Sequence, residues 1–273
     1  MISYEALQMS GYSANGSIST NSKRISTYFG QAADDWRDIN HNQGIDMYYI
    51  PGIERAFAPG RLNYHYKWEG ASYAVDSACA SSSTAVGLAC DALINRDCDT
   101  ALAGGGNIMC SPDVFAGLSR GGFLSTTGGC KSFSDNADGY CRGEGVGVVV
   151  LKRLEDALHG NDNVLAVISG HGRNHSALAH SITHPHAETQ QRLYNQVLQQ
   201  AHTDSSQISY VEMHGTATGA GDFAEMTSVT SVFGKRRTKQ NPLILGAVKA
   251  NIGHGEAVSL ISYYTLTKAD TFH

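Results

Sequence analysis

The run Val75-Asp-Ser-Ala-Cys-Ala-Ser-Ser-Ser83 joins an apolar strand pattern at residues 73–75 to a helical pattern at residues 81–95. Its small side chains permit a sharp turn from strand to helix, with Cys79 exposed at the apex. The unpaired N–H groups and the dipole at a helix amino terminus favour anions, so we expect the thiolate of Cys79 to be stabilised there. The same N–H groups can donate to a developing oxyanion. Cys79 is therefore a candidate nucleophile, and a packed core thiol is the alternative.

Apolar runs of strand length alternate with helical stretches along the rest of the chain, which predicts a layered α/β fold with mostly buried sheets. Further strands are predicted at residues 100–104, 146–152, 164–170, 208–213 and 243–248. Helices are predicted at residues 4–7, 189–201 and 223–233. Several of these strands end directly before polar residues, which is where open α/β folds place their functional sites.

Two of these strand ends lead into glycine-rich turns that contain a histidine. The first turn is His214-Gly-Thr-Ala-Thr-Gly-Ala-Gly-Asp222, and the second is Lys249-Ala-Asn-Ile-Gly-His254. Histidine is the side chain best suited to donate or shuttle a proton near neutral pH. Together with Cys79, the two histidines indicate covalent chemistry at a thiol, assisted by imidazole N–H groups.

The composition is that of a soluble, mildly acidic globular protein. The chain has 273 residues, of which 41% are hydrophobic, and its 20 basic and 25 acidic residues give a formal net charge of −5. These values exclude a disordered chain, and a single short basic run at residues 235–237 argues against nucleic-acid binding. The apolar runs are of strand length, so no membrane span is predicted. The six cysteines form no C-x-x-C pair and no secretion signal is seen, which predicts a reducing, cytoplasmic location.

A metal centre and a dinucleotide site are both disfavoured by spacing. Five histidines lie within residues 171–186, but they lack the H-E-x-x-H pattern and have no carboxylate or thiol at ligand spacing. The glycine run at residues 143–147 has valine where a dinucleotide fingerprint needs its third glycine. The glycines at residues 104–106, 121–122 and 128–129 are interpreted as backbone turns.

The motifs at Cys79, His214 and His254, in this order, resemble the three signature motifs of the β-ketoacyl synthases, which have the thiolase fold. The intervening sequence is similar to the ketosynthase domain of fungal non-reducing iterative type I polyketide synthases. The similar stretches are Arg55-Ala-Phe-Ala-Pro-Gly-Arg61, Cys130-Lys-Ser-Phe133, Ala137-Asp-Gly-Tyr-Cys-Arg142 and Asn174-His-Ser176. The resemblance implies the layered αβαβα architecture of that fold.

The resemblance also implies an acyltransferase that performs a decarboxylative Claisen condensation. Cys79 would accept the growing acyl chain from a phosphopantetheine thioester. His214 and His254 would promote decarboxylation of a malonyl extender and stabilise the enolate oxygen. The carbanion would then attack the Cys79 thioester and give a β-ketoacyl product, so that covalent catalysis divides one difficult step into two.

Supporting roles follow from the same resemblance. Lys249 would tune the electrostatic field of the pocket and hold a carboxylate, which we expect to be Glu225. Thr216 and Thr218 would hydrogen-bond the pantetheine arm. Asp222 is expected to cap the helix that follows it rather than take part in the chemistry.

The implied partners are an acyl carrier protein, malonyl and acyl thioesters, and a second copy of the chain in a homodimer with contacts at residues 108–112. No cofactor or metal is expected to bind directly, since the carrier protein brings the phosphopantetheine. Three alternatives stay open: a non-catalytic ketosynthase-like partner that shapes chain length, a fatty-acid-type β-ketoacyl-carrier-protein synthase, and a cysteine hydrolase. Retention of Cys79 and both histidines argues against the first, and Lys249 with a second histidine argues against the third.

The chain departs from the family pattern at two positions and at its ends. Ala80 stands where the family has Ser after the nucleophile, and Ala217 stands where it has Gly between the two threonines. The first strand and helix of the fold would precede Met1, and the sequence from about residue 261 differs from the family. We therefore expect a partial ketosynthase domain at residues 1–260, truncated at both ends, and a divergent tail at residues 261–273.

Overall fold

The chain divides into two compact units in the computed structural model, which describes residues 1–12, 21–41 and 43–260. Unit 1 contains Met1–Val114, Gly143–Val167 and the residues from Gly255 onward. Unit 2 contains Phe115–Arg142 and Ile168–His254. Each unit is therefore built from segments that are distant in sequence. The predicted tail at residues 261–273 lies outside the described residues.

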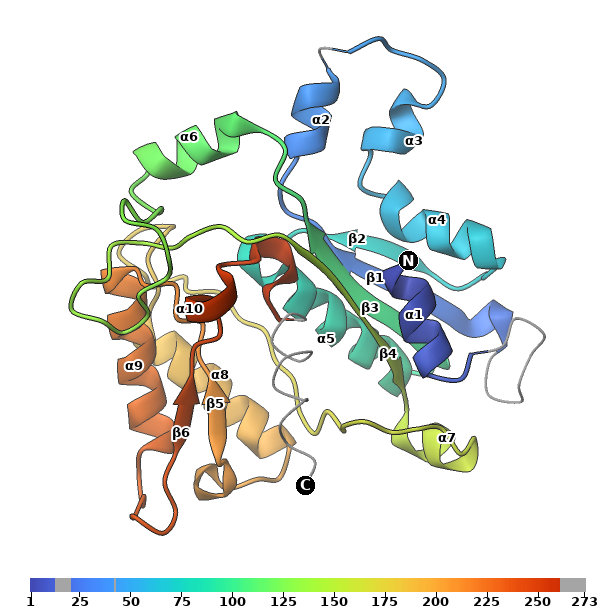
Figure 1. The fold of residues 1–273 in the computed structure, drawn as a ribbon. Coiled ribbons are helices and arrows are strands. Elements are labelled where there is room, and N and C mark those ends of the chain that lie inside the picture. The colour runs from blue at the N-terminus through green and yellow to red at the C-terminus, as the bar shows by residue number, and fades with distance from the viewer. Residues whose placement is uncertain (13–20, 42, 261–273) are drawn as a thin grey trace. The chain divides into compact units, whose positions relative to one another are not determined.

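A four-stranded sheet forms the centre of unit 1 (Figure 1). Its strands run in the order β2 (Ser72–Val75), β1 (Ile25–Gly30), β3 (Thr100–Asn107) and β4 (Gly145–Lys152). β1 is parallel to both of its neighbours, whereas β4 is antiparallel to β3. The two central strands are buried along nearly their whole length, as expected for strands that are covered on both faces.

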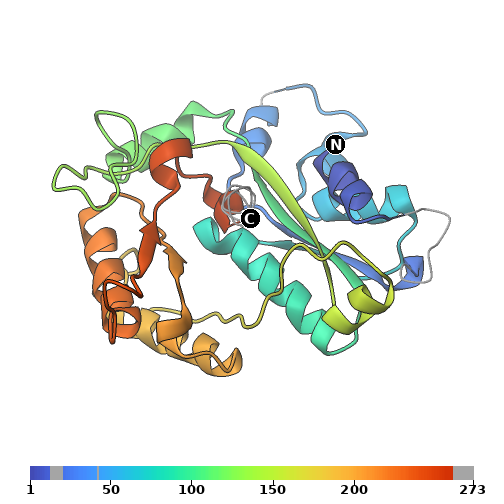
Figure 2. The same ribbon diagram turned by 60° about the horizontal axis from the view of Figure 1, so that its bottom comes forward.

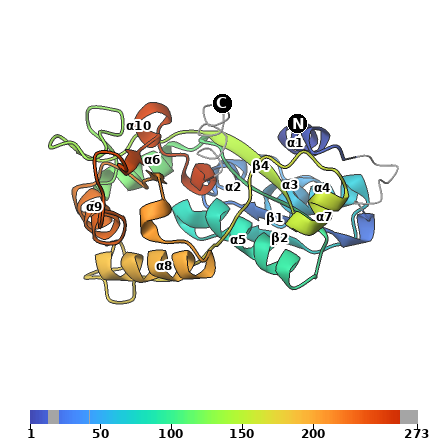
Figure 3. The same ribbon diagram turned by 90° about the horizontal axis from the view of Figure 1, so that it is seen from below.

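Helices cover both faces of this sheet, because successive side chains of the central strands point in opposite directions. On one face, α5 (Ser81–Ile94) packs through small side chains in a cluster that contains Tyr28, Ala85, Ala89, Ala92, Leu93, Ala101 and Ala103. On the other face, α1 (Ile2–Met9) and α4 (Phe57–Tyr66) cover a cluster that contains Leu7, Ile25, Phe29, Trp68 and Leu102. Figure 3 shows α5 and α1 on opposite sides of the strands.

Short helical segments complete the connections of unit 1. They are η1 (Ser22–Arg24), α2 (Asp35–Asn40), α3 (Tyr49–Ile53), α7 (Leu154–His159) and η4 (Glu256–Val258), and α6 (Pro112–Arg120) leads from unit 1 into unit 2. Among the helices of the described residues, none combines the length and the apolar character that crossing a membrane requires.

Unit 2 is built around the two-stranded parallel sheet of β5 (Tyr210–Glu212) and β6 (Ile244–Gly246). Helices α8 (Ala187–Gln200) and α9 (Gly219–Phe233) lie side by side against it (Figure 2). The buried side chains between these elements are Met213, Val229, Val232 and Phe233, with Tyr194, Leu198 and Val211 packed around them. The short helix α10 (Lys249–Ile252) follows β6.

Two of the sequence predictions about secondary structure are wrong. Residues 164–170 do not form a strand, and Val167 is 55% exposed. A β-strand needs a neighbouring strand for its backbone hydrogen bonds, and an apolar pattern does not show whether such a neighbour is present. The glycines at residues 104–106 lie inside β3 rather than in a turn. A Cβ atom on Gly104 would stand 2.3 Å from the carbonyl oxygen of Gly147, so the close approach of β4 excludes a side chain there.

Gly30, the last residue of β1, lies directly against the start of α5, and we expect Gly30→Ala to destabilise the protein. A Cβ atom at this position would stand 2.6 Å from the backbone carbonyl carbon of Ser81 and 2.6 Å from the backbone nitrogen of Ser82. Overpacking of this kind costs about 1–3 kcal/mol of the free energy of unfolding, which urea denaturation measures. The control is Gly106→Ala in β3, where the nearest atom to the new Cβ is 3.6 Å away. Equal stability of the two variants would contradict this packing argument.

Candidate active site

The turn between β2 and α5 holds Cys79 in unit 1. Ala78 has a φ of 53°, and the short helix η2 (Ala78–Ala80) leads directly into α5. A non-glycine residue in the left-handed region costs about 1–2 kcal/mol, so surrounding contacts must hold this turn. Cys79 lies at the predicted strand-to-helix turn, but it is half-buried there rather than exposed as predicted, and its thiol is not in a disulfide.

Ser81 supports this turn from the inside. Its hydroxyl accepts a hydrogen bond from the N–H of Ser77 at 3.0 Å and donates to the carbonyl oxygen of Ala78 at 2.6 Å. Ser81 is fully buried. On the outside of the turn, the carboxylate of Asp76 accepts a hydrogen bond from the N–H of Ala78 at 3.0 Å. The small polar residues around Cys79 therefore fix the backbone conformation as well as permitting the sharp turn.

The other predicted site residues lie in unit 2, where Glu225 of α9 holds the turn that carries His214. The buried carboxylate of Glu225 accepts hydrogen bonds from the N–H of His214 and, at 2.9 Å, from the N–H of Gly215. Burial raises the pKa of Glu225, and these two N–H groups and the charge of Lys249 oppose that rise. Glu225 thus fixes the backbone beneath the first histidine.

Lys249, the first residue of α10, is completely buried and contacts His214 directly. Its ammonium donates a 2.7 Å hydrogen bond to the carbonyl oxygen of His214, and its Nζ lies 3.4 Å from the Nδ1 of the ring. An ammonium group can only donate, so this contact favours the tautomer in which Nδ1 accepts and Nε2 carries the proton. The charge of Lys249 lowers the pKa of the Glu225 carboxyl, and the direct pairing of these two side chains stays a prediction.

His254 stands at the end of the second predicted motif, and its backbone N–H donates a 2.7 Å hydrogen bond to the carbonyl oxygen of Cys141. Its ring packs edge-on against Tyr140, with 4.8 Å between ring centroids, and against His214, with 5.5 Å between centroids. The side chain of His254 is 3% exposed. The two histidines therefore lie together within unit 2.

Both imidazoles are held in the neutral form. Desolvation by the surrounding protein, followed by the charge of Lys249, lowers the pKa of His214 from 6.5 to about 3, although His214 is an exposed residue and His254 is the buried one of the pair. The same two causes, with a further contribution from His214, lower the pKa of His254 to about 2. At neutral pH each ring consequently offers one N–H donor and carries no charge.

Thr216, Ala217 and Thr218 form the turn between His214 and α9. The hydroxyl oxygens of the two threonines are 3.2 Å apart, and Ala217 is completely buried with a φ of 58°. Glycine occupies such backbone most easily, which gives a physical reason for the glycine that the family has at this position. In this chain Ala217 adopts the same region at the cost of local strain.

The prediction that Asp222 caps the following helix is wrong. The helix α9 begins at Gly219 with Thr218 as its N-cap, so Asp222 lies inside the first turn. Its buried carboxylate instead accepts hydrogen bonds from the N–H of Ala217 at 3.1 Å and from the N–H of Phe133 at 2.6 Å. Asp222 thus connects the turn at residues 216–218 to a loop more than 80 residues earlier in the chain. No local sequence pattern indicates this connection.

No sequence pattern indicated that the ring of Tyr140 packs against His254, although Tyr140 lies in one of the stretches that resemble the family. Likewise, Ser132 donates a hydrogen bond to the carbonyl oxygen of Gly215. Both residues belong to residues 130–142, a loop that reaches the histidines only in the folded chain. An aromatic or hydroxyl residue in a polar loop is too common to identify such contacts from sequence.

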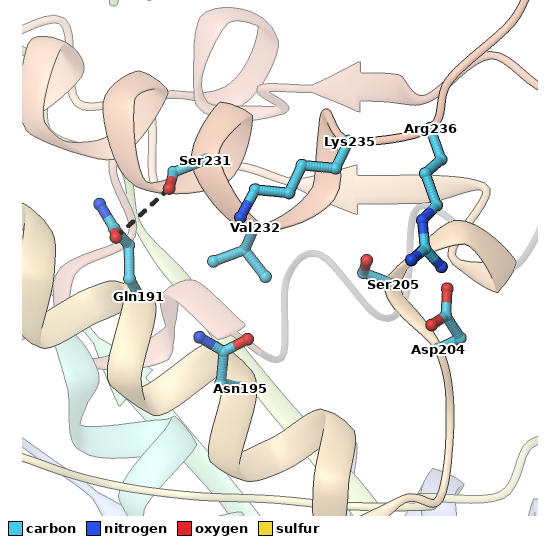
Figure 4. Close-up of a pocket in the computed structure, with 8 residues that line it drawn as sticks. All are labelled: Gln191, Asn195, Asp204, Ser205, Ser231, Val232, Lys235 and Arg236. Atoms are coloured by element: carbon cyan, nitrogen blue, oxygen red, sulfur yellow. Dashed lines mark hydrogen bonds between the residues drawn. The ribbon is translucent and has the colours of Figure 1, made fainter.

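A polar cavity of about 320 Å³ lies elsewhere in unit 2 (Figure 4). It is lined by Gln191, Asn195, Asp204, Ser205, Ser231, Val232, Lys235 and Arg236. Ser231 and Gln191 are hydrogen-bonded across it at 3.3 Å, and Lys235 and Arg236 are exposed. None of the predicted site residues lines this cavity, so it is separate from the two histidines.

Comparison with known proteins gives matches along nearly the whole chain. Residues 1–157 match the family described as Beta-ketoacyl synthase, N-terminal domain, and residues 165–266 match Beta-ketoacyl synthase, C-terminal domain. The chain is 71% identical over 259 residues to the non-reducing polyketide synthase stmB of Aspergillus ustus. It is 64% identical over 260 residues to the non-reducing polyketide synthase men2 of Menisporopsis theobromae. Both matches cover 95% of this chain.

The same fold occurs in a solved structure, the ketosynthase from module 6 of the bacillaene synthase from Bacillus subtilis 168. The two chains are 32% identical and superimpose with a TM-score of 0.87 over 97% of this chain. This chain spans 46% of that ketosynthase and 13% and 12% of the two fungal synthases.

Proposed function

The chain belongs to the β-ketoacyl synthase family, and on this premise we propose that it catalyses a decarboxylative Claisen condensation in polyketide biosynthesis. The matches confirm the predicted resemblance to fungal non-reducing polyketide synthases and the predicted thiolase-like α/β fold. The site residues Cys79, His214 and His254 enter the proposal as the three reacting groups. The observation that carries it is the contact between two neutral imidazoles, one exposed (His214) and one buried (His254), with Lys249 donating to the carbonyl oxygen of His214.

The first step of the proposed reaction is acyl transfer to Cys79. The sulfur attacks the carbonyl carbon of an acyl thioester, a new C–S bond forms, and the pantetheine thiol leaves with the proton. The dipole at the amino end of α5 would favour the anion that develops on the carbonyl oxygen, although the N–H of Ser81, the first residue of α5, already donates to the carbonyl oxygen of Ala78. This step stores the acyl chain as a thioester of the enzyme.

The second and third steps use the two histidines of unit 2. Their N–H groups donate to the thioester oxygen of a malonyl extender, so that loss of CO2 leaves its electron pair in a stabilised enolate. The enolate carbon then attacks the acyl carbonyl on Cys79, a C–C bond forms, and the Cys79 thiolate is released. Neutral imidazoles suit this task because they donate a hydrogen bond to an oxygen that gains charge only in the transition state.

Partners and substrates follow from the same proposal. An acyl carrier protein would present malonyl and acyl thioesters on its phosphopantetheine arm, and Thr216 and Thr218 would bind that arm. The chain is proposed to act as a homodimer in the cytoplasm, with contacts at residues 108–112, where Ile108 is 59% exposed. No directly bound metal or further cofactor is part of the proposed reaction.

The proposal is tested with the full-length protein in two stages. An acyl thioester is added and the mass of the peptide that contains Cys79 is followed; malonyl-carrier protein is then added and the product is analysed. Acylation followed by a β-ketoacyl product supports condensation. Absence of acylation would favour the non-catalytic partner, and acylation that ends only in hydrolysis would favour a cysteine hydrolase.

The lowered pKa values of the histidines predict the pH dependence of malonyl decarboxylation. An ordinary imidazole, with a pKa near 6.5, would become protonated as the pH falls from 7 to 5. Here the pKa values of His214 and His254 are about 3 and about 2, so both rings stay neutral over that range. We expect the initial rate of CO2 release to stay within about twofold between pH 7 and pH 5.

Lys249→Met provides the matched variant for this pH dependence. The charge of Lys249 is the second cause of the lowered pKa of both histidines, so its removal should move the acid limb of the rate profile to higher pH. A wild-type rate that falls with an apparent pKa near 6.5 would contradict the assignment of neutral imidazoles.

A further inference from the structure

Arg55 lies in the connection between α3 and α4 and reaches the turn that carries Cys79. Its Nη1 donates to the carboxylate of Asp76, the residue that follows β2. The other oxygen of the same carboxylate accepts the 3.0 Å hydrogen bond from the N–H of Ala78. An unbroken series of contacts therefore runs from the Arg55 guanidinium to the residue directly before Cys79.

The rest of the guanidinium is fixed on a different segment. Nε donates to Asp34 at 2.9 Å, Nη2 lies 2.9 Å from the second oxygen of that carboxylate, and Nη2 also donates to the carbonyl oxygen of Ala32 at 3.0 Å. A planar guanidinium can hold two carboxylates in fixed directions, which a lysine ammonium cannot do. Arg55 thereby ties the segment after β1 to the segment after β2.

The conformation that these contacts hold is a strained one, because Ala78 has a φ of 53° where glycine would be favoured. Burial would raise the pKa of Asp76, but the N–H of Ala78 and the Arg55 guanidinium lower it below its usual value, so the carboxylate is charged when it holds the turn. The side chains of Arg55, Asp34 and Asp76 are 30%, 37% and 43% exposed. Partly exposed ion pairs add little to overall stability, so a role in positioning explains this arrangement better than a role in folding.

We propose that Arg55 is a positioning residue that orients the thiol of Cys79. Asp34 orients the guanidinium of Arg55, which in turn holds the carboxylate of Asp76 on the N–H of Ala78, a residue whose backbone is in the left-handed region. This inference rests on the proposed function, because it assigns to Arg55 the geometry of acyl transfer at Cys79. Displacement of a reacting atom by about 1 Å can reduce a rate about 100-fold. Loss of Arg55 frees the Asp76 carboxylate to leave Ala78, which relaxes the turn.

The test compares Arg55→Met, Arg55→Lys and Asp76→Asn in the full-length protein. We expect Arg55→Met to lower kcat for acylation of Cys79 about 10- to 100-fold, with KM within about twofold of wild type. Arg55→Lys should recover part of this loss because it keeps the charge. The melting temperature should change by less than about 3 °C. Arg61→Met is the control, since Arg61 is an exposed arginine nearby that donates to the carbonyl of Pro51.

The double variant decides whether Arg55 acts through Asp76. If it does, Arg55→Met combined with Asp76→Asn acylates no more slowly than the slower single variant. Independent, multiplicative losses, or a wild-type kcat in Arg55→Met, would overturn the proposal.

Alkylation of Cys79 by iodoacetamide, followed by mass on its peptide, separates this inference from the proposed function. It requires no acyl substrate, and we expect it to be at least about fivefold slower in Arg55→Met at pH 7 because the thiolate is no longer aligned with the helix terminus. If the wild type is alkylated but never acylated, the proposed function fails, and the alkylation series still decides the role of Arg55. Alkylation of Arg55→Met at the wild-type rate would count against the positioning role.

Discussion

Cys79→Ala is expected to abolish acyl loading, with a loss of acylation rate on the order of 10⁴-fold or more. The sulfur is the atom that forms the new bond, and an alanine methyl group cannot replace it. The fold should persist, because Cys79 is half-buried at the surface turn and the hydrogen bonds of Ser81 and Asp76 are made to neighbouring backbone groups. Mass spectrometry of the intact protein after incubation with an acyl thioester measures this loss.

Two further measurements make the Cys79→Ala result specific. Cys90→Ala removes a half-buried thiol from the helix that follows the turn and should load acyl groups normally. Malonyl decarboxylation should continue in Cys79→Ala, since the proposal assigns that step to the histidines. Acyl groups found on Cys79→Ala at the wild-type level would place the nucleophile elsewhere.

His214→Ala and His254→Ala are each expected to lower the rate of condensation about 10²- to 10³-fold, the usual loss when one donor to a developing oxyanion is removed. Acyl loading of Cys79 should be reduced far less, because sulfur attack depends on the turn before α5. Product formation after addition of malonyl-carrier protein to the preloaded enzyme measures the condensation separately from loading.

The matched control for the histidine variants is His159→Ala, which removes an exposed imidazole at the end of α7 and should leave both stages unchanged. The two alanine variants combined should lose less than the product of their separate effects, because the rings contact each other and are proposed to bind the same oxygen. If the His214→Ala and His254→Ala variants lost acyl loading but kept malonyl decarboxylation, the roles assigned to the thiol and the imidazoles would be reversed.

The sequence predicted correctly those helices and strands whose bounds depend on residues that are neighbours along the chain. The helix after Cys79 was predicted at residues 81–95 and is found at Ser81–Ile94, because a run of helix-compatible residues begins directly after a turn of small ones. The strand predicted at residues 146–152 corresponds to Gly145–Lys152. The prediction failed for residues 164–170, because whether an apolar segment joins a sheet depends on a neighbouring strand that its own pattern does not describe.

At the site, too, the sequence indicated which residues are involved but did not indicate the contacts between residues that are distant along the chain. The motifs pointed to the two histidines and Lys249, and the family resemblance pointed to Glu225; the structure places these residues in one unit. The motifs did not indicate that Glu225 binds the backbone N–H groups of His214 and Gly215, or that Lys249 donates to the carbonyl of His214. Those contacts depend on how α9 and α10 pack against the strands.

By itself, the sequence determined the chemical groups of this protein: a thiol at a strand-to-helix turn, two imidazoles in glycine-rich turns, and the family to which their order belongs. Only the tertiary structure decided how these groups are held. The Asp222 bond to the loop at Phe133 and the Arg55 contact with Asp76 join residues that are 89 and 21 positions apart. Hydrogen bonds between distant segments form only when the packed core brings them within about 3 Å, and no local periodicity encodes that distance.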